Sequence, residues 1–202
     1  MQRRSRILLY TLLTLPFSAA RAHTWQGVEL DPDRLIRPAL LARALRSFEA
    51  HRDSNLADTR IAIVDFAKAS FERRLFLVDL TSGAVTSYLV AHGRGSDADH
   101  DARAERFSDA TGSHASSLGA YRSAGLYQGQ HGLSLALDGL DPSNRSARER
   151  AVVLHSQWYV SDRMIQQHNK LGRSWGCFVV DRTIIADLAA ALADGGFIYA
   201  GD

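Results

Sequence analysis

The sequence predicts a β-rich α+β domain, and three observations indicate this class. Short β-branched runs recur along the chain, for example over residues 61–66. Turn-forming residues separate these runs, most clearly at 81–83 and 128–132. Few stretches show the apolar spacing of a helix. Many short strands with few helices favour a mixed sheet or sandwich with a few peripheral helices.

The first 22 residues have the features of a secretory signal. A start that contains three arginines precedes an apolar run over residues 7–20, and Ala20-Arg21-Ala22 fits a small-x-small cleavage site. The run is short for a permanent membrane anchor. We therefore expect Sec-type export to the periplasm, a mature chain that starts near His23, and no membrane anchor.

Cleavage of this signal changes the charge of the chain. The sequence has 24 basic and 22 acidic residues, hence +2, but residues 1–22 hold four arginines and no acid. The mature chain would keep 20 basic against 22 acidic residues, or −2. The charge is therefore no evidence for nucleic-acid binding. We expect a monomer with a lead-in and helix over 23–58 and a catalytic domain over 59–202.

The first half of the mature chain is expected to change from helix to strand. An irregular lead-in covers residues 24–37, and a helix follows because apolar residues from Leu40 to Phe48 recur at helical spacing. Strands are expected at 61–66 and 75–80, and a tight turn leads to a hairpin partner at 84–91. The polar stretch 93–113 is expected to form an ordered rim or flap over a site.

The second half is expected to be mostly strand. The expected elements are, in order, a hairpin of 118–127 and 133–137 around a turn at 128–132, a short charged helix at 147–150, a buried strand at 151–154, a helix at 161–168 capped by Ser161, a loop at 172–176, a strand at 177–180, a helix from Asp181, and a last strand at 197–200.

Cys177 is the single cysteine of the chain and the first candidate for chemistry. One thiol cannot form an internal disulfide, so in an exported protein it indicates intermolecular pairing or a reactive group; a small buried apolar residue is the alternative. His155, at the end of the strand at 151–154, can stabilise a thiolate as an ion pair.

Gly176 lets a carbonyl approach backbone N–H groups that would hold an oxyanion. Ser174 and Ser156 can orient the imidazole or line the pocket.

The segment Ser174-Trp175-Gly176-Cys177 after His155 resembles the motif of the L,D-transpeptidases of the YkuD type. It is most similar to a branch that reads Ser-Trp-Gly-Cys after Gly-Arg, as Gly172-Arg173 do here. Segments 90–96, 116–121 and 127–133 resemble that branch as well, so the resemblance covers residues 61–199. Three departures are Trp175 in place of the family histidine, a gap of 18 residues between His155 and Ser174, and Phe178 where the branch often has proline.

The resemblance implies a role for each matching residue. Cys177 would be the acylated nucleophile, His155 its base, and the 174–177 loop, Trp175 included, the oxyanion hole. Substrate contacts are suggested for four further residues, for which a solvated or structural role stays open: Arg173, Arg94, His131 and Tyr121.

The implied reaction is acyl transfer on peptidoglycan stem peptides, with neither metal nor cofactor. Cys177 would attack the L-centre carbonyl of the diamino acid, expel the terminal D-alanine, and pass the acyl group to an amine of a neighbouring stem as a 3→3 cross-link. An L,D-carboxypeptidase, with water as acceptor, and a non-catalytic wall-binding protein stay open. Metal-ligand spacing is missing among the histidines, and a papain-like peptidase would place its histidine after its cysteine.

Overall fold

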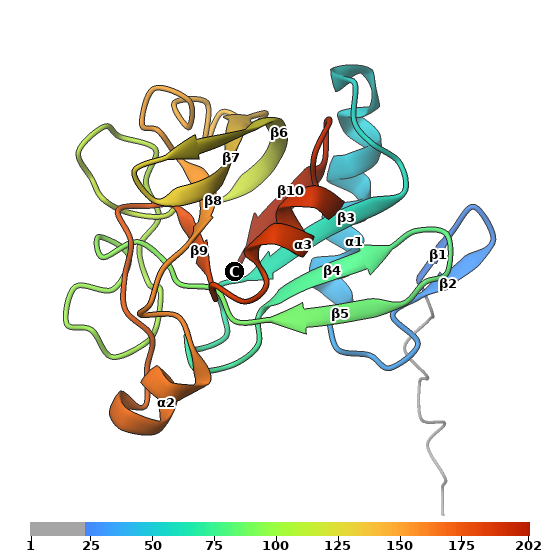
Figure 1. Ribbon diagram of the computed structural model, residues 1–202. Coiled ribbons are helices and arrows are strands. Elements are labelled where there is room, and N and C mark those ends of the chain that lie inside the picture. The colour runs from blue at the N-terminus through green and yellow to red at the C-terminus, as the bar shows by residue number, and fades with distance from the viewer. Residues whose placement is uncertain (1–22) are drawn as a thin grey trace, which may run out of the picture.

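The computed structural model describes residues 23–202, so the predicted signal over residues 1–22 lies outside the described residues. An eight-stranded mixed sheet organises the fold (Figure 1). Its strands are β3 (Arg60–Asp65), β4 (Leu75–Asp79), β5 (Val85–Tyr88), β6 (Gly119–Gly129), β7 (Gly132–Gly139), β8 (Val153–Ser156), β9 (Phe178–Val180) and β10 (Phe197–Gly201). They lie in the order β5-β4-β3-β10-β6-β7-β8-β9.

Two strand pairs of this sheet are parallel, β3 with β10 and β8 with β9, and the others are antiparallel. The chain that leaves β5 crosses to the opposite edge, where Ala91 pairs with Val179 of β9 and Gly93 with Ser174. These bridges bring the two edges together, so the sheet is nearly closed into a barrel.

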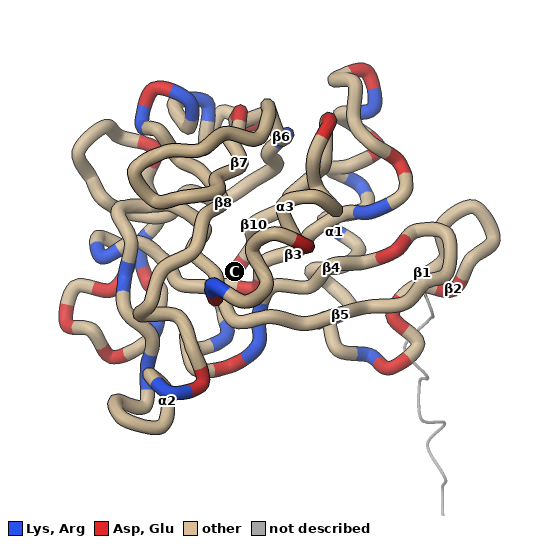
Figure 2. The backbone as a smooth tube through the Cα atoms, viewed as in Figure 1, with Lys and Arg blue, Asp and Glu red and all other residues tan. Residues whose placement is uncertain are grey.

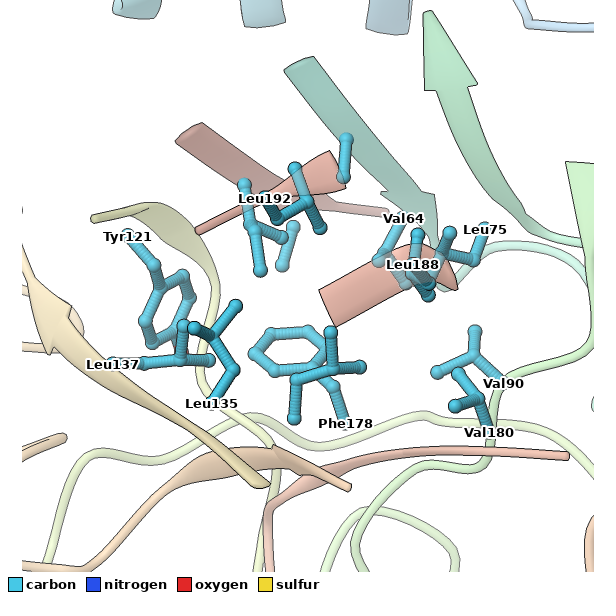
Figure 3. Packing of buried hydrophobic residues seen from close by; sticks show 14 of the residues in the cluster. Val64, Leu75, Val90, Tyr121, Leu135, Leu137, Phe178, Val180, Leu188 and Leu192 are labelled. Atoms are coloured by element: carbon cyan, nitrogen blue, oxygen red, sulfur yellow. The ribbon is translucent and has the colours of Figure 1, made fainter. Parts of the chain in front are cut away.

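Strand β3 is buried on both faces because helices cover the sheet from two sides. Ile61 and Ile63 contact α1 (Pro38–Ala50) in one cluster, whereas Ala62 and Val64 join α3 (Ile185–Ala191) in the other. This division follows from the period of two along a strand. Figure 3 shows the second cluster. The N-terminal helix therefore shares its core with the sheet.

Phe178 stands at the centre of the second cluster and fixes the start of β9. Its ring stacks on Phe66, with 6.2 Å between centroids, and meets Tyr121 edge-on at 5.2 Å. Burial of one aromatic side chain contributes about 2–3 kcal/mol. Cys177 is thereby attached directly to a residue of the core.

Most predicted strands are confirmed, and four details differ. Residues 24–37 are not wholly irregular, since β1 (His23–Trp25) and β2 (Val28–Leu30) form a hairpin around Gln26 and Gly27, both at positive φ. Residues 147–150 form turns rather than a helix. The loop between β6 and β7 shortens to Gln130 and His131 because the ladder runs to Gly129–Gly132. The helix expected from Asp181 begins at Ile185.

The remaining helix, α2 (Asp162–His168), starts as predicted, because the Ser161 hydroxyl accepts a hydrogen bond from the Met164 amide at 3.2 Å. The polar stretch 93–113 carries no helix or strand, but its backbone is ordered by hydrogen bonds such as those from Asp101 and Ala102 to Asp97. Charges of both signs alternate along the loops, and the strands are mostly uncharged (Figure 2). Across residues 23–202, no helix is long and apolar enough to cross a membrane.

Candidate active site

The parallel register of β8 and β9 places the two predicted chemical residues on one face of the sheet. Leu154 pairs with Phe178 and His155 with Val179, so Cys177 lies one step earlier, beside Val153. Side chains at matching positions of neighbouring strands point to the same face, and the direction alternates along each strand. Leu154 and Phe178 therefore enter the core, while Cys177 and His155 point to the opposite face.

Cys177 and His155 line one pocket with a volume of about 630 Å³. The pocket is therefore lined by both residues that the sequence predicted for chemistry. The other residues that line it are Gln130, His131, Arg150, Ala151, Gln157, Tyr159, Arg173, Ser174 and Trp175.

The imidazole of His155 has a defined tautomer. Its Nδ1 lies 3.2 Å from the carbonyl oxygen of Ser156, and since a carbonyl only accepts, Nδ1 carries the proton and Nε2 keeps its lone pair. Ser156 thus orients the imidazole of His155 with its backbone carbonyl and not with its hydroxyl. Burial, and next the charge of His131, lower the pKa of His155 to about 4. The imidazole is neutral at pH 7 and is able to accept a proton.

The thiol of Cys177 is also neutral in this state. Its Sγ donates to the carbonyl oxygen of Ala151 at 3.6 Å. Burial raises the pKa of the thiol, against the opposing influence of the Val153 backbone and the Arg150 charge. The thiolate–imidazolium pair expected from the sequence is therefore corrected to an uncharged thiol and imidazole, because burial disfavours both charged forms.

The loop before Cys177 is held by Ser174. Its hydroxyl donates to the Cys177 carbonyl at 2.8 Å and accepts from the Gly176 amide at 3.1 Å. Its backbone pairs with His92 and Arg94. Ser174 therefore shapes this loop instead of orienting the imidazole.

Gly176 occupies a position that only glycine suits. Its φ is +111°, and a Cβ there would lie 2.7 Å from the Ala115 carbonyl oxygen and 2.9 Å from Nη2 of Arg150. Both the backbone angle and the space exclude a side chain.

The aromatic and cationic residues expected at the site have different environments. Trp175 is 67% exposed, stacks on His114 with 4.7 Å between centroids, and has the Arg94 guanidinium 5.8 Å from its ring centroid. Arg94 does not line the pocket of Cys177. Arg173 does line it and donates to the backbone carbonyl of Asp97.

Tyr121 requires a correction. It is fully buried in the core, and its hydroxyl donates to the Ser117 carbonyl oxygen at 2.8 Å. Burial raises its pKa to about 12. The expected substrate contact is thus replaced by a packing role, because the sheet directs this side chain inward.

Five residues that line the pocket were not predicted as site residues: Gln130, Arg150, Ala151, Gln157 and Tyr159. Gln157 contacts Nδ1 of His131 at 3.2 Å. Burial, and next the nearby Cys177, raise the pKa of Tyr159 to about 12. Arg150 and Gln157 lie within five positions of His155 along the chain. This proximity was the one feature of the sequence that could have placed them at the pocket.

A further polar cluster lies outside the pocket. Asp97, Asp99 and Asp101 bring carboxylate oxygens within 4.8 Å of one another. Asp97 already accepts from His92 and from two backbone amides, so its oxygens are engaged. Among residues 23–202, no carboxylate side chain lines the pocket of Cys177.

Comparison with known families agrees with this arrangement. Residues 33–200 match the family model of the L,D-transpeptidase catalytic domain. The chain belongs to this family. No curated protein sequence matches the chain significantly.

Solved structures of L,D-transpeptidases are among those similar to this domain. One is LdtMt1 in complex with imipenem (12% identity, 72% of this chain, 60% of that chain, TM-score 0.42). Another comes from Mycobacterium smegmatis (9% identity, 71% of this chain, 59% of that chain, TM-score 0.41). A third is the helical cell shape determining protein Pgp2 from Campylobacter jejuni (13% identity, 72% of this chain, 49% of that chain, TM-score 0.40). The L,D-transpeptidase domain described here spans less than two thirds of each of these chains.

Proposed function

We propose that this protein is an exported cysteine acyltransferase that acts on peptidoglycan stem peptides. The observation that carries the proposal is that Cys177 and His155 line the same pocket, which would accommodate a peptide carbonyl. Membership of the L,D-transpeptidase family supports the choice of substrate. Export to the periplasm is part of the proposal and rests on the signal features of residues 1–22.

The uncharged resting pair favours general-base activation during the reaction. As the stem carbonyl approaches, Nε2 of His155 takes the thiol proton and Cys177 Sγ bonds to the carbonyl carbon. Backbone N–H groups beside Gly176 hold the oxyanion. When the tetrahedral intermediate collapses, the bond to D-alanine breaks, and the imidazolium returns its proton to the leaving amine. A thioester on Cys177 remains.

The second half of the reaction would transfer this acyl group. An amine of a neighbouring stem attacks the thioester carbonyl, His155 removes the amine proton, and the thiolate leaves. The product is a 3→3 cross-link. Water in place of the amine would give an L,D-carboxypeptidase with the same residues. Arg173 lines the pocket and is the candidate that would bind a stem carboxylate.

The test uses the mature protein, a carbapenem and purified tetrapeptide stems. We expect intact mass to show one covalent carbapenem adduct on wild-type protein and none on Cys177→Ala, and we expect the wild type to release D-alanine. Joined stems among the products indicate transfer, and shortened stems alone indicate hydrolysis. Stem binding without release would favour a non-catalytic wall-binding protein. D-alanine release that persists in Cys177→Ala and stops with a chelator would overturn the cysteine mechanism.

A further inference from the structure

Arg150 lies under the nucleophile loop, and the mechanism above assigns it no step. Its side chain is 4% exposed and lines the pocket of Cys177. Arg150 lies three positions before the start of β8 and opens the short segment that also supplies Ala151, whose carbonyl accepts from the thiol, and the base His155. One stretch of six residues therefore brings a cation, a thiol acceptor and a base to the same pocket.

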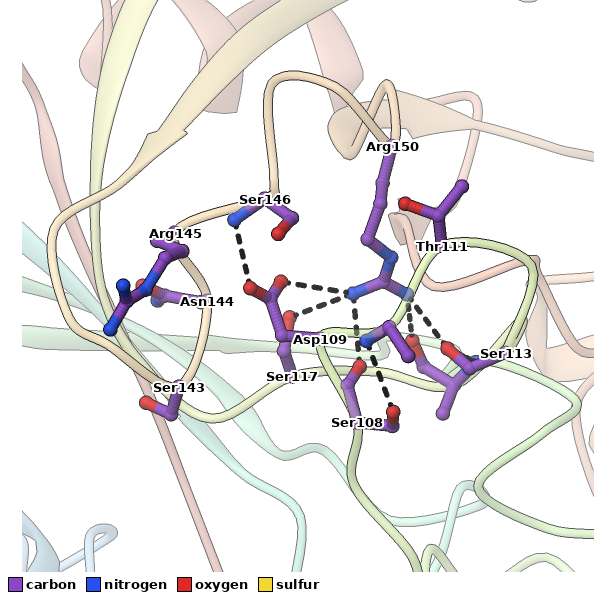
Figure 4. A network of polar contacts seen from close by, with 12 residues as sticks. Ser108, Asp109, Thr111, Ser113, Ser117, Ser143, Asn144, Arg145, Ser146 and Arg150 are labelled. Carbon is purple, nitrogen blue, oxygen red and sulfur yellow. Dashed lines mark hydrogen bonds and ion pairs between the residues drawn. The ribbon is translucent and has the colours of Figure 1, made fainter.

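The guanidinium binds the segment 108–117 from both of its ends (Figure 4). Nη1 donates to the Ser108 carbonyl at 3.0 Å and to the Ser117 hydroxyl at 3.2 Å, and it lies 3.4 Å from Asp109. Nη2 donates to the Ala115 carbonyl. A planar fork can hold several acceptors at once, which a lysine ammonium on a flexible stem cannot reproduce.

This fork meets the nucleophile loop at Gly176. The Ala115 carbonyl oxygen and Nη2 of Arg150 are the two nearest groups to the position that a Gly176 Cβ would occupy. The backbone of Gly176 therefore rests directly on the hydrogen bond between them. Movement of the guanidinium would move the support of the loop that carries the oxyanion donors and Cys177.

We propose that Arg150 is a positioning residue of this active site, which clamps the segment 108–117 beneath Gly176 and places a buried positive charge beside the Cys177 sulfur. The inference rests on the proposed cysteine chemistry. Other charged or titratable side chains near the sulfur are His155, His131, Tyr159 and Arg173, which line the same pocket. Asp109 is the acid that faces Arg150.

The two parts of this role predict different results for two substitutions. Arg150→Lys keeps the charge and loses the fork, so carbapenem acylation slows by about tenfold or more while the pH midpoint of Cys177 alkylation stays near that of the wild type. Arg150→Met loses both, so acylation slows and the midpoint rises by about one pH unit. Iodoacetamide alkylation followed by intact mass measures the midpoint and needs no stem substrate.

A third variant should shift the alkylation midpoint in the opposite direction. It keeps the charge effect testable if Arg150→Met does not fold. Asp109→Asn leaves Arg150 less neutralised and keeps an oxygen for the Ser146 amide, so the alkylation midpoint falls. Circular dichroism and thermal unfolding identify folded variants. The proposal is overturned if folded Arg150→Met alkylates and acylates like the wild type, or if Asp109→Asn raises the midpoint. A wild-type protein that alkylates normally but takes no carbapenem would refute the proposed function and leave the test of Arg150 intact.

Discussion

The ring of His131 lies nearly flat against the ring of His155, with 4.4 Å between the centroids and 21° between the planes. His131 comes from the tight turn between β6 and β7, whereas His155 is the third of the four residues of β8. The stack joins the exposed tip of a hairpin to the proposed base. His131 was expected to reach the cleft, and the stack suggests a role that can be tested, namely that His131 lowers the pKa of His155.

Replacement of His131 by phenylalanine is expected to move the acid limb of the pH profile. Phenylalanine keeps a ring for stacking and removes the charge that, after burial, helps to lower the pKa of His155 to about 4. The pKa of His155 should rise, so activity should begin to fall at a higher pH, by up to about one unit. The pH dependence of carbapenem acylation measures this, with His131→Ala as the variant that removes both ring and charge. An unchanged or lower acid limb in His131→Phe would contradict the prediction.

Gly176→Ala is expected to destabilise the protein and to abolish acylation. A methyl group there meets the Ala115 carbonyl oxygen at 2.7 Å at a φ of +111°. The strain should cost about 1–3 kcal/mol in the free energy of unfolding. Gly125→Ala is a matched control, since Gly125 has a φ of +112° with open space around it. Urea unfolding separates the backbone cost, which both share, from the clash at Gly176; equal effects of the two substitutions would refute the tight contact.

Stability should fall as the pH drops from about 6.5 to about 4. His92 is buried, its Nε2 lies 3.0 Å from Asp97 and its Nδ1 2.9 Å from Arg74. Burial and the Arg74 charge lower the pKa of His92 to about 4. Within this window the unfolded chain binds a proton that the folded chain does not, so the free energy of unfolding decreases with decreasing pH, by roughly 3 kcal/mol for such a group.

Urea titrations at several pH values test this dependence. His92→Gln cannot gain a proton and should show a shallower decrease between pH 6.5 and 4, while the remaining slope reflects His155. If His92→Gln is folded and its slope equals that of the wild type, His92 does not contribute in the way described.

Tyr121→Phe is expected to affect stability and not substrate affinity. The substitution removes the hydrogen bond from the buried hydroxyl to the Ser117 carbonyl and should cost about 1 kcal/mol. Steady-state kinetics with tetrapeptide stems should give an unchanged KM. A severalfold rise in KM without a loss of stability would restore the substrate contact first expected for this residue.

Much of the fold was predictable because its strands are short, apolar and separated by turn residues. The strands around Ile61, Phe76 and Phe197 appear where the pattern places them. The hairpin of β1 and β2 was missed because three-residue strands carry almost no periodic signal. At residues 147–150 the chain forms turns and not the predicted helix, because its charged helix-forming residues occupy a segment too short for propensity alone to form a helix.

The sequence by itself determined the reactive candidates, because a single cysteine after Gly176 and a histidine after an apolar run are local features of the chain. The tertiary structure decided what surrounds them. The parallel pairing of β8 with β9 put Cys177 and His155 on one face, burial left both uncharged at rest, and folding of distant segments brought His131 against His155 and Ala115 against Gly176. Contacts between residues far apart along the chain, and the desolvation that follows from packing, depend on the whole fold and leave no mark in a local pattern.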